Sequence, residues 1–106
     1  KDIISNSKPR KITVELIKNS VAKEFDIKMD DFNSKKRTRA IAYPRQIAMY
    51  LTRELTDLSL PKIGDEFGGR DHTTVIHAYD KISADIIEND DLKKRIDGLI
   101  KNIKGE

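Results

Sequence analysis

The chain has 106 residues and a net charge of +3, enough for one compact domain and too few for two. Apolar and charged residues each make up 37% of it, and no apolar run approaches the roughly 20 residues that span a bilayer or forms a signal-peptide core. The absence of cysteine excludes disulfides and thiolate metal sites, and it fits a reducing, cytoplasmic location.

Residues 1–10 are polar and interrupted by Pro9, so they are interpreted as a linker or as the end of a preceding segment. One domain is expected over residues 11–104.

The first predicted helix runs from about residue 14 to 25, with Thr13 as its N-cap. Its apolar stripe, at helical spacing, consists of Val14, Ile17, Val21 and Phe25. Residues 27–32 are expected to form a short turn or one helical turn. This turn would add two side chains, Ile27 and Phe32, to the core.

A basic loop is predicted at residues 33–39. Residues 33–53 contain six basic side chains and no acidic one, whereas residues 84–106 contain five basic and six acidic ones. A merely solvated face would intersperse the two signs. This asymmetry favours a binding site for a polyanion.

A second helix is expected to begin near Tyr43 or Pro44, because proline is tolerated in a first helical turn. Its buried stripe would be Ile47, Ala48, Leu51 and Leu55. At 100° per residue, the opposite side carries Arg45, Gln46, Met49 and Arg53.

A short helix and a longer one follow. Ser59 can cap the short helix, with Pro61 in its first turn and Gly68 as its left-handed stop. Its inward side chains are Ile63 and Phe67. Asp71 can cap the longer helix, which runs to about residue 87. Its narrow apolar stripe consists of Val75, Ala78, Tyr79, Ile82 and Ile86. Its outward side chains are Thr73, His77 and Asp80.

A last helix, capped by Asn89 or Asp90, carries an apolar stripe of Leu92, Ile96, Leu99 and Ile103. No segment alternates with period two. The predicted fold class is therefore all-α: a compact helical domain with a helix-turn-helix preceded by a basic loop.

Five consecutive polar residues, 70–74, open the fourth long helix, where they would make poor core material. Arginine can pair with guanine and threonine methyl groups can meet thymine methyl groups in a major groove. A helix, a tight Gly-Gly turn and a helix with a polar tip are the parts of a helix-turn-helix.

The sequence supports neither an enzymatic site nor a metal site. Gly64 and Gly69 have the spacing of a phosphate-binding loop, but Arg70 and Asp71 stand where Lys and Ser/Thr are needed. The two histidines, five residues apart, lie about 140° apart on a helix, which does not suit metal ligation. No triad or buried carboxylate pair can be argued. We predict no catalytic residue, no metal site and no cofactor in this chain.

The basic loop has two open interpretations. Arg37 and Arg39, just ahead of a helix, suit insertion of an arginine into a narrow minor groove. Nonspecific attraction to phosphates explains the loop equally well. Along the next helix, backbone clamps are expected at Arg45, Gln46 and Arg53.

The segments FGGRDHTTVIHA, KKRTRAIAYPRQIAMYL and SLPKIG together resemble the C-terminal DNA-binding domain (domain IV) of the bacterial chromosomal replication initiator family, DnaA. The resemblance covers residues 8–104, and the core G-G-R-D-H-T-T-V shows no departure from it. The family's upstream AAA+ ATPase domain is missing, so ATP, ADP and Mg²⁺ are expected only there.

The resemblance implies binding to double-stranded DnaA boxes, sites close to TTATNCACA at the replication origin. It places Arg37 in the minor groove and, at base edges in the major groove, Asp71, His72, Thr73 and Thr74. It places phosphate contacts on Lys35, Arg39, Arg45, Gln46, Arg53, Leu60, Pro61 and Arg70. Asp71 either accepts from cytosine N4 or serves only as the helix N-cap.

The resemblance also implies other protomers as partners through the upstream domain, acidic phospholipids near the N-terminal linker, and a monomeric isolated domain. The competing hypothesis is a helical module that docks an acidic protein or anionic lipid. The loop lacks the broad apolar face that a membrane-bound helix needs, which favours DNA.

Overall fold

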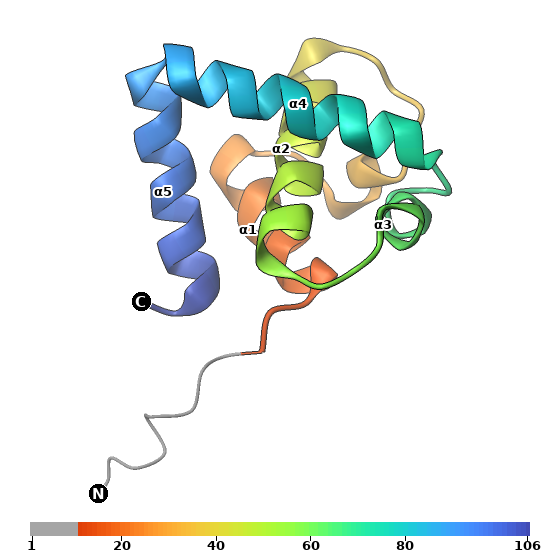
Figure 1. The fold of residues 1–106 in the computed structure, drawn as a ribbon, viewed down its shortest axis with the longest axis horizontal. Coiled ribbons are helices and arrows are strands. Elements are labelled where there is room, and N and C mark those ends of the chain that lie inside the picture. The colour runs from red at the N-terminus through yellow and green to blue at the C-terminus, as the bar shows by residue number, and fades with distance from the viewer. Residues whose placement is uncertain (1–10) are drawn as a thin grey trace, which may run out of the picture.

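The computed structural model describes residues 11–106, and in this part of the chain every regular element is helical. The predicted linker, residues 1–10, lies outside the described residues. The elements are α1 Val14–Phe25, the 3₁₀ turn η2 Met29–Phe32, α2 Arg39–Leu55, α3 Leu60–Glu66, α4 His72–Glu88 and α5 Asp90–Lys104 (Figure 1). The predicted all-α fold class is confirmed.

Three of the predicted helix caps are confirmed by hydrogen bonds. The side chains of Thr13, Ser59 and Asn89 each accept from the backbone N–H three residues further on, at 3.1–3.2 Å. Each cap thus satisfies a donor that has no partner within its own helix. Simple N-cap chemistry explains where α1, α3 and α5 begin.

The predicted start of α2 is wrong. The helix begins at Arg39, after Thr38 as N-cap, and Pro44 lies inside it. The carbonyl of Thr38 accepts from the N–H groups of Ile41 and Ala42, so a complete helical turn precedes the proline. The helix tolerates Pro44 at this position because the φ angle of proline is compatible with a helix, although the proline removes one backbone hydrogen bond. The basic loop is therefore shortened to residues 33–38.

The predicted outer face of α2 is also partly wrong. Arg45 is only 7% exposed and Met49 only 2% exposed, whereas Gln46 is half-buried and Arg53 is exposed. The reason is that α2 lies at the centre of the fold and contacts α1, α3, α4 and η2 (Figure 1). A helix enclosed on several sides buries more than one stripe.

The core lies around α2. Phe32 of η2 and Phe67, which follows α3, are fully buried and meet edge to face with their ring centroids 6.2 Å apart. The last helix, α5, packs against α1 and α4. It buries Ile96, Leu99 and Ile103. None of the helices in residues 11–106 combines the length and apolar composition needed to cross a bilayer.

Two glycines shape the α3–α4 turn. Gly68 and Gly69 have φ of 80° and 75°, so the predicted left-handed stop at Gly68 is confirmed. A Cβ atom on Gly68 would lie 2.7 Å from the carbonyl oxygen of Asn33, so the turn is in close contact with the start of the basic loop. The helix-turn-helix and the basic loop therefore meet directly.

Candidate nucleic-acid interface

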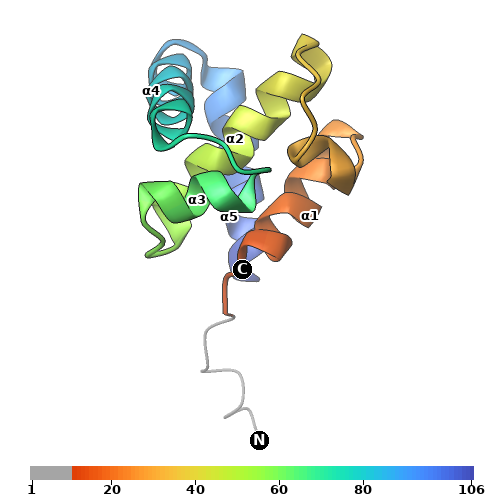
Figure 2. The same cartoon turned by 90° about the vertical axis from the view of Figure 1, so that its right-hand side faces the viewer.

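The basic loop (residues 33–38) and the α4 tip (residues 71–74) line one hollow on the molecule, although more than 30 residues separate them in sequence. Figures 1 and 2 both show the loop beside the α3–α4 turn. The hollow has a volume of about 420 Å³ and is lined by Asn33, Lys35, Arg37, Arg45, Gly68, Gly69, Arg70 and Thr74. Two of the predicted base-reading residues, Arg37 of the loop and Thr74 of α4, thus line the same hollow.

Exposed side chains lie on both the basic loop and the first turn of α4. Lys35 and Arg37 of the loop are exposed, as are the four residues from Asp71 to Thr74. The next residue, Val75, is completely buried. The first turn of α4 therefore projects from the body of the protein, while its second turn anchors it.

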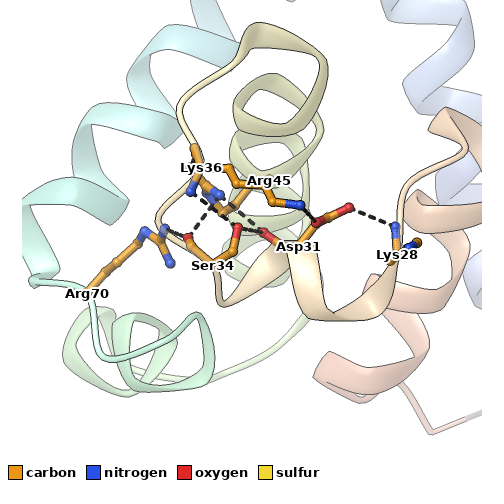
Figure 3. A network of polar contacts seen from close by, with 6 residues as sticks. All are labelled: Lys28, Asp31, Ser34, Lys36, Arg45 and Arg70. Atoms are coloured by element: carbon orange, nitrogen blue, oxygen red, sulfur yellow. Dashed lines mark hydrogen bonds and ion pairs between the residues drawn. The ribbon is translucent and has the colours of Figure 1, made fainter.

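Arg45 does not point outward from α2 but braces the basic loop from inside. Its guanidinium group donates to the backbone carbonyls of Asp31 (3.1 Å), Ser34 (3.2 Å) and Lys36 (2.8 Å) (Figure 3). Burial lowers its pKa, and the nearby positive charge of Arg70 adds to this effect. The outward orientation predicted for this side chain is wrong because the loop folds back over it.

Arg70 makes a second brace from the turn. It donates to the carbonyls of Phe32 (3.3 Å), Phe67 and Ser34, and burial lowers its pKa. Ser34 therefore receives hydrogen bonds from both guanidinium groups (Figure 3). Because both groups have partners within the protein, the structure gives Arg45 and Arg70 a part in shaping the loop, beside the phosphate contacts predicted for them.

Asp31 closes the network at the base of the loop. Its carboxylate accepts from the backbone N–H of Lys28 at 3.0 Å and from Lys36 Nζ at 3.3 Å. The hydrogen bond from the Lys28 backbone is the main cause that lowers the pKa of Asp31, and Lys36 adds to it. The loop is thus held at both ends by charged side chains.

Asp71 occupies the N-cap of α4 with an extended backbone, as predicted. In the described first turn of α4, however, the Asp71 side chain does not form the N-cap hydrogen bond to a backbone N–H that Thr13, Ser59 and Asn89 form. One carboxylate oxygen lies 3.0 Å from Nδ1 of His72. The pKa of Asp71 is lowered chiefly by hydrogen bonding to the Thr73 hydroxyl, with smaller contributions that include the charge of His72. The carboxylate is therefore ionised at neutral pH and exposed.

Two exposed arginines of α2 rest on tyrosine rings. The guanidinium carbon of Arg39 lies 4.5 Å from the centroid of Tyr43, and that of Arg53 lies 5.3 Å from the centroid of Tyr79. Tyr43 donates to Asp85 at 2.7 Å, and burial, together with this carboxylate, raises its pKa to about 12. Stacking restricts where each cation can be presented. Arg39 belongs to α2 itself and not, as predicted, to the loop.

The remaining predicted contact residues lie on neighbouring elements. Gln46 lines a smaller hollow between α2 and α4, together with Thr74 and His77. Leu60 and Pro61 form the first turn of α3. The structure thus brings together the loop, the turn and the α4 tip. Arg53, in the last turn of α2, and the start of α3 do not line the shared hollow.

Sequence reasoning missed Lys18 of α1. Its ammonium group donates to Asn33 Oδ1 at 3.2 Å and to the carbonyl of Glu66. The only signal in the sequence is that Lys18 directly follows Ile17 of the apolar stripe, where a long stem can lie along apolar surface. That position predicts partial burial but identifies no partner.

A family model described as "Bacterial dnaA protein helix-turn-helix" matches residues 14–82, from the start of α1 to most of α4. The chain is 65% identical over 105 residues to the chromosomal replication initiator protein DnaA of Caldanaerobacter subterraneus subsp. tengcongensis. It is 64% identical to the DnaA proteins of Thermoanaerobacter sp. (strain X514) and Thermoanaerobacter pseudethanolicus. Each alignment covers 99% of this chain, which spans 23% of the length of those relatives. Because the match takes in well over half of its residues, the chain belongs to the bacterial DnaA helix-turn-helix family.

Proposed function

We propose that this non-catalytic domain binds double-stranded DNA and recognises DnaA-box sequences at a bacterial replication origin. The observation that carries the proposal is the shared hollow: both Arg37 of the loop and Thr74 of α4 line it. Two readers on one face can enter neighbouring grooves of the same duplex. Family membership supports the same function, because the relatives are named replication initiators.

The tip of α4 is the proposed major-groove reader. Asp71, His72, Thr73 and Thr74 are exposed, and α4 is anchored behind them by the buried Val75. Helix-turn-helix proteins read bases with N-terminal residues of the second helix. Threonine methyl groups suit thymine, and the ionised Asp71 can accept from cytosine N4.

Arg37 is the proposed minor-groove reader. Its side chain is exposed, but the loop that carries it is fixed by Arg45, Arg70 and Asp31. A fixed backbone lowers the entropy lost when an arginine enters a narrow groove. Proposed phosphate contacts flank the two readers at Lys35, Arg39, Gln46, Arg53, Leu60 and Pro61, with additional charge from Arg45 and Arg70.

The proposal is tested by electrophoretic shift against a DnaA box, its single-base variants and a scrambled duplex. We expect Arg37→Ala and Thr73→Ala each to reduce discrimination by about 1–3 kcal/mol at the base positions they read. As the matched control, Arg53→Ala should weaken binding to all sequences alike and reduce the salt slope by about one. Equal affinity of the wild-type domain for box and scrambled duplex at physiological salt would refute sequence-specific binding.

A further inference from the structure

Lys18 is a buried lysine whose head group joins two parts of the proposed interface. Its side chain is 8% exposed and extends from α1. The ammonium group donates to the Asn33 side chain at 3.2 Å and to the backbone carbonyl of Glu66. Asn33 is the first residue of the basic loop, and Glu66 is the last residue of α3. One charge is thus bonded to both segments.

The surroundings of the ammonium group make this an ordered junction. Its nitrogen lies 4.7 Å from the ring centroid of Phe67, whose edge-to-face partner is Phe32. Burial lowers the pKa of Lys18, and the charge of Glu66 partly opposes that effect. A buried charge is costly unless it is well bonded, so the ammonium group resists separation of its two acceptors.

The junction lies close in sequence to both proposed readers. Gly68 of the turn is packed against the Asn33 carbonyl so closely that a Cβ would lie 2.7 Å from it. Four residues beyond Asn33 stands Arg37, and four residues beyond Glu66 stands Arg70, next to the α4 tip. A shift at the junction therefore changes the spacing between the minor-groove and major-groove side chains.

We infer that Lys18 is a positioning residue for DNA specificity: it fixes the basic loop against the helix-turn-helix without touching DNA. This inference rests on the proposed function. Two readers recognise a duplex together only when their spacing matches that of the grooves, and a displacement of about 1 Å is enough to weaken such a site. The effect of Lys18 is thus expected on discrimination between sequences more than on overall affinity.

The test compares Lys18→Met with the matched control Lys23→Met, which removes the same charge from an exposed position in the last turn of α1. We expect Lys18→Met to reduce the ratio of box to scrambled affinity by about 2- to 30-fold, the range over which residues without ligand contact can modulate coupling. The lost discrimination should fall at the base positions that Arg37→Ala relaxes. Lys23→Met should keep the wild-type ratio.

A double-mutant cycle sharpens the result. If Lys18 acts through the loop, Lys18→Met should cost little discrimination in a chain that already carries Arg37→Ala. Additive losses, or a uniform loss equal to that of Lys23→Met, overturn the inference. If circular dichroism shows that Lys18→Met does not fold, Asn33→Ala is used instead, because it removes the exposed side-chain acceptor of the Lys18 ammonium group. Unchanged discrimination in Asn33→Ala overturns the inference. Failure of the wild-type domain to discriminate at all would instead refute the proposed function.

Discussion

At the scale of single residues, the basic side chains that line the shared hollow divide into two groups. Those with exposed head groups, such as Arg37 and Lys35, face the shared hollow. Arg45 and Arg70 use their planar, multiple donors to hold backbone carbonyls of the loop. Net charge alone does not distinguish these groups, because each side chain adds one positive charge. The difference lies in where the N–H groups find acceptors.

Arg45→Ala is predicted to destabilise the fold. Three carbonyls would lose a charged donor, so the free energy of unfolding should fall by about 2–3 kcal/mol. Urea denaturation followed by circular dichroism measures this loss. The exposed Arg53, on the same helix, supplies the control, and Arg53→Ala should cost less than about 1 kcal/mol. Equal stability of Arg45→Ala and wild type would show that the loop does not depend on this brace.

At the scale of elements, local chemistry predicted most of the helices. Thr13, Ser59 and Asn89 identified three helix starts because an N-cap acts within three residues of sequence. The exposed polar tip of α4 was likewise visible in the sequence. The start of α2 was missed because Pro44 can sit inside a helix when a full turn has formed before it.

The internal partners of the basic side chains could not be predicted. Arg45 contacts carbonyls 9 to 14 residues away, and Lys18 contacts a carbonyl 48 residues away. Helical periodicity states which side of a helix a residue occupies, but not which later segment covers that side. The long-range part of the site therefore required the folded structure.

Gly64→Ala is predicted to destabilise the helix-turn-helix. A Cβ at Gly64 would lie 2.0 Å from the carbonyl oxygen of Arg70, a backbone atom that already neighbours the Arg70 N–H bond to Gly64. Overpacking should cost at least about 2 kcal/mol, which outweighs the roughly 0.5–1 kcal/mol that alanine normally adds to a helix. Thermal and urea denaturation measure the change.

Gly98 in α5 provides the opposite case. A Cβ there meets nothing within 4 Å, so Gly98→Ala should stabilise the domain by about 0.5–1 kcal/mol through helix propensity alone. If both variants change stability in the same direction, close backbone contact at Gly64 is not what decides the outcome.

At the scale of the whole molecule, the proposed interface and α5 lie at opposite ends. Figure 1 places α5 on the left and the α3–α4 turn on the right. The family match ends at residue 82, so α5 is outside the matched region, yet it packs against α1 and α4 and supplies buried apolar side chains. Stability and recognition should therefore be separable.

Ile96→Ala is predicted to lower stability without altering DNA recognition. Ile96 is 2% exposed, so truncation should cost about 2–5 kcal/mol and lower Tm by roughly 10–25 °C. Natural domains of this size have about 5–15 kcal/mol of stability, so the variant should remain folded in the cold. Its Kd for a DnaA box, measured at low temperature where circular dichroism shows full helicity, should equal that of the wild type.

Ile87 is the matched control, because it is 81% exposed on α4 and its truncation to alanine should change stability by less than about 0.5 kcal/mol. Arg37→Ala should give the reverse pattern to Ile96→Ala, with normal Tm and weakened discrimination. A folded Ile96→Ala domain that has lost discrimination would mean that α5, through α1 and α4, also sets the geometry of the proposed DNA interface. The physical basis for separability is that a cavity in a packed core is local when the neighbouring helices keep their other contacts, and α1 and α4 both remain packed against α2.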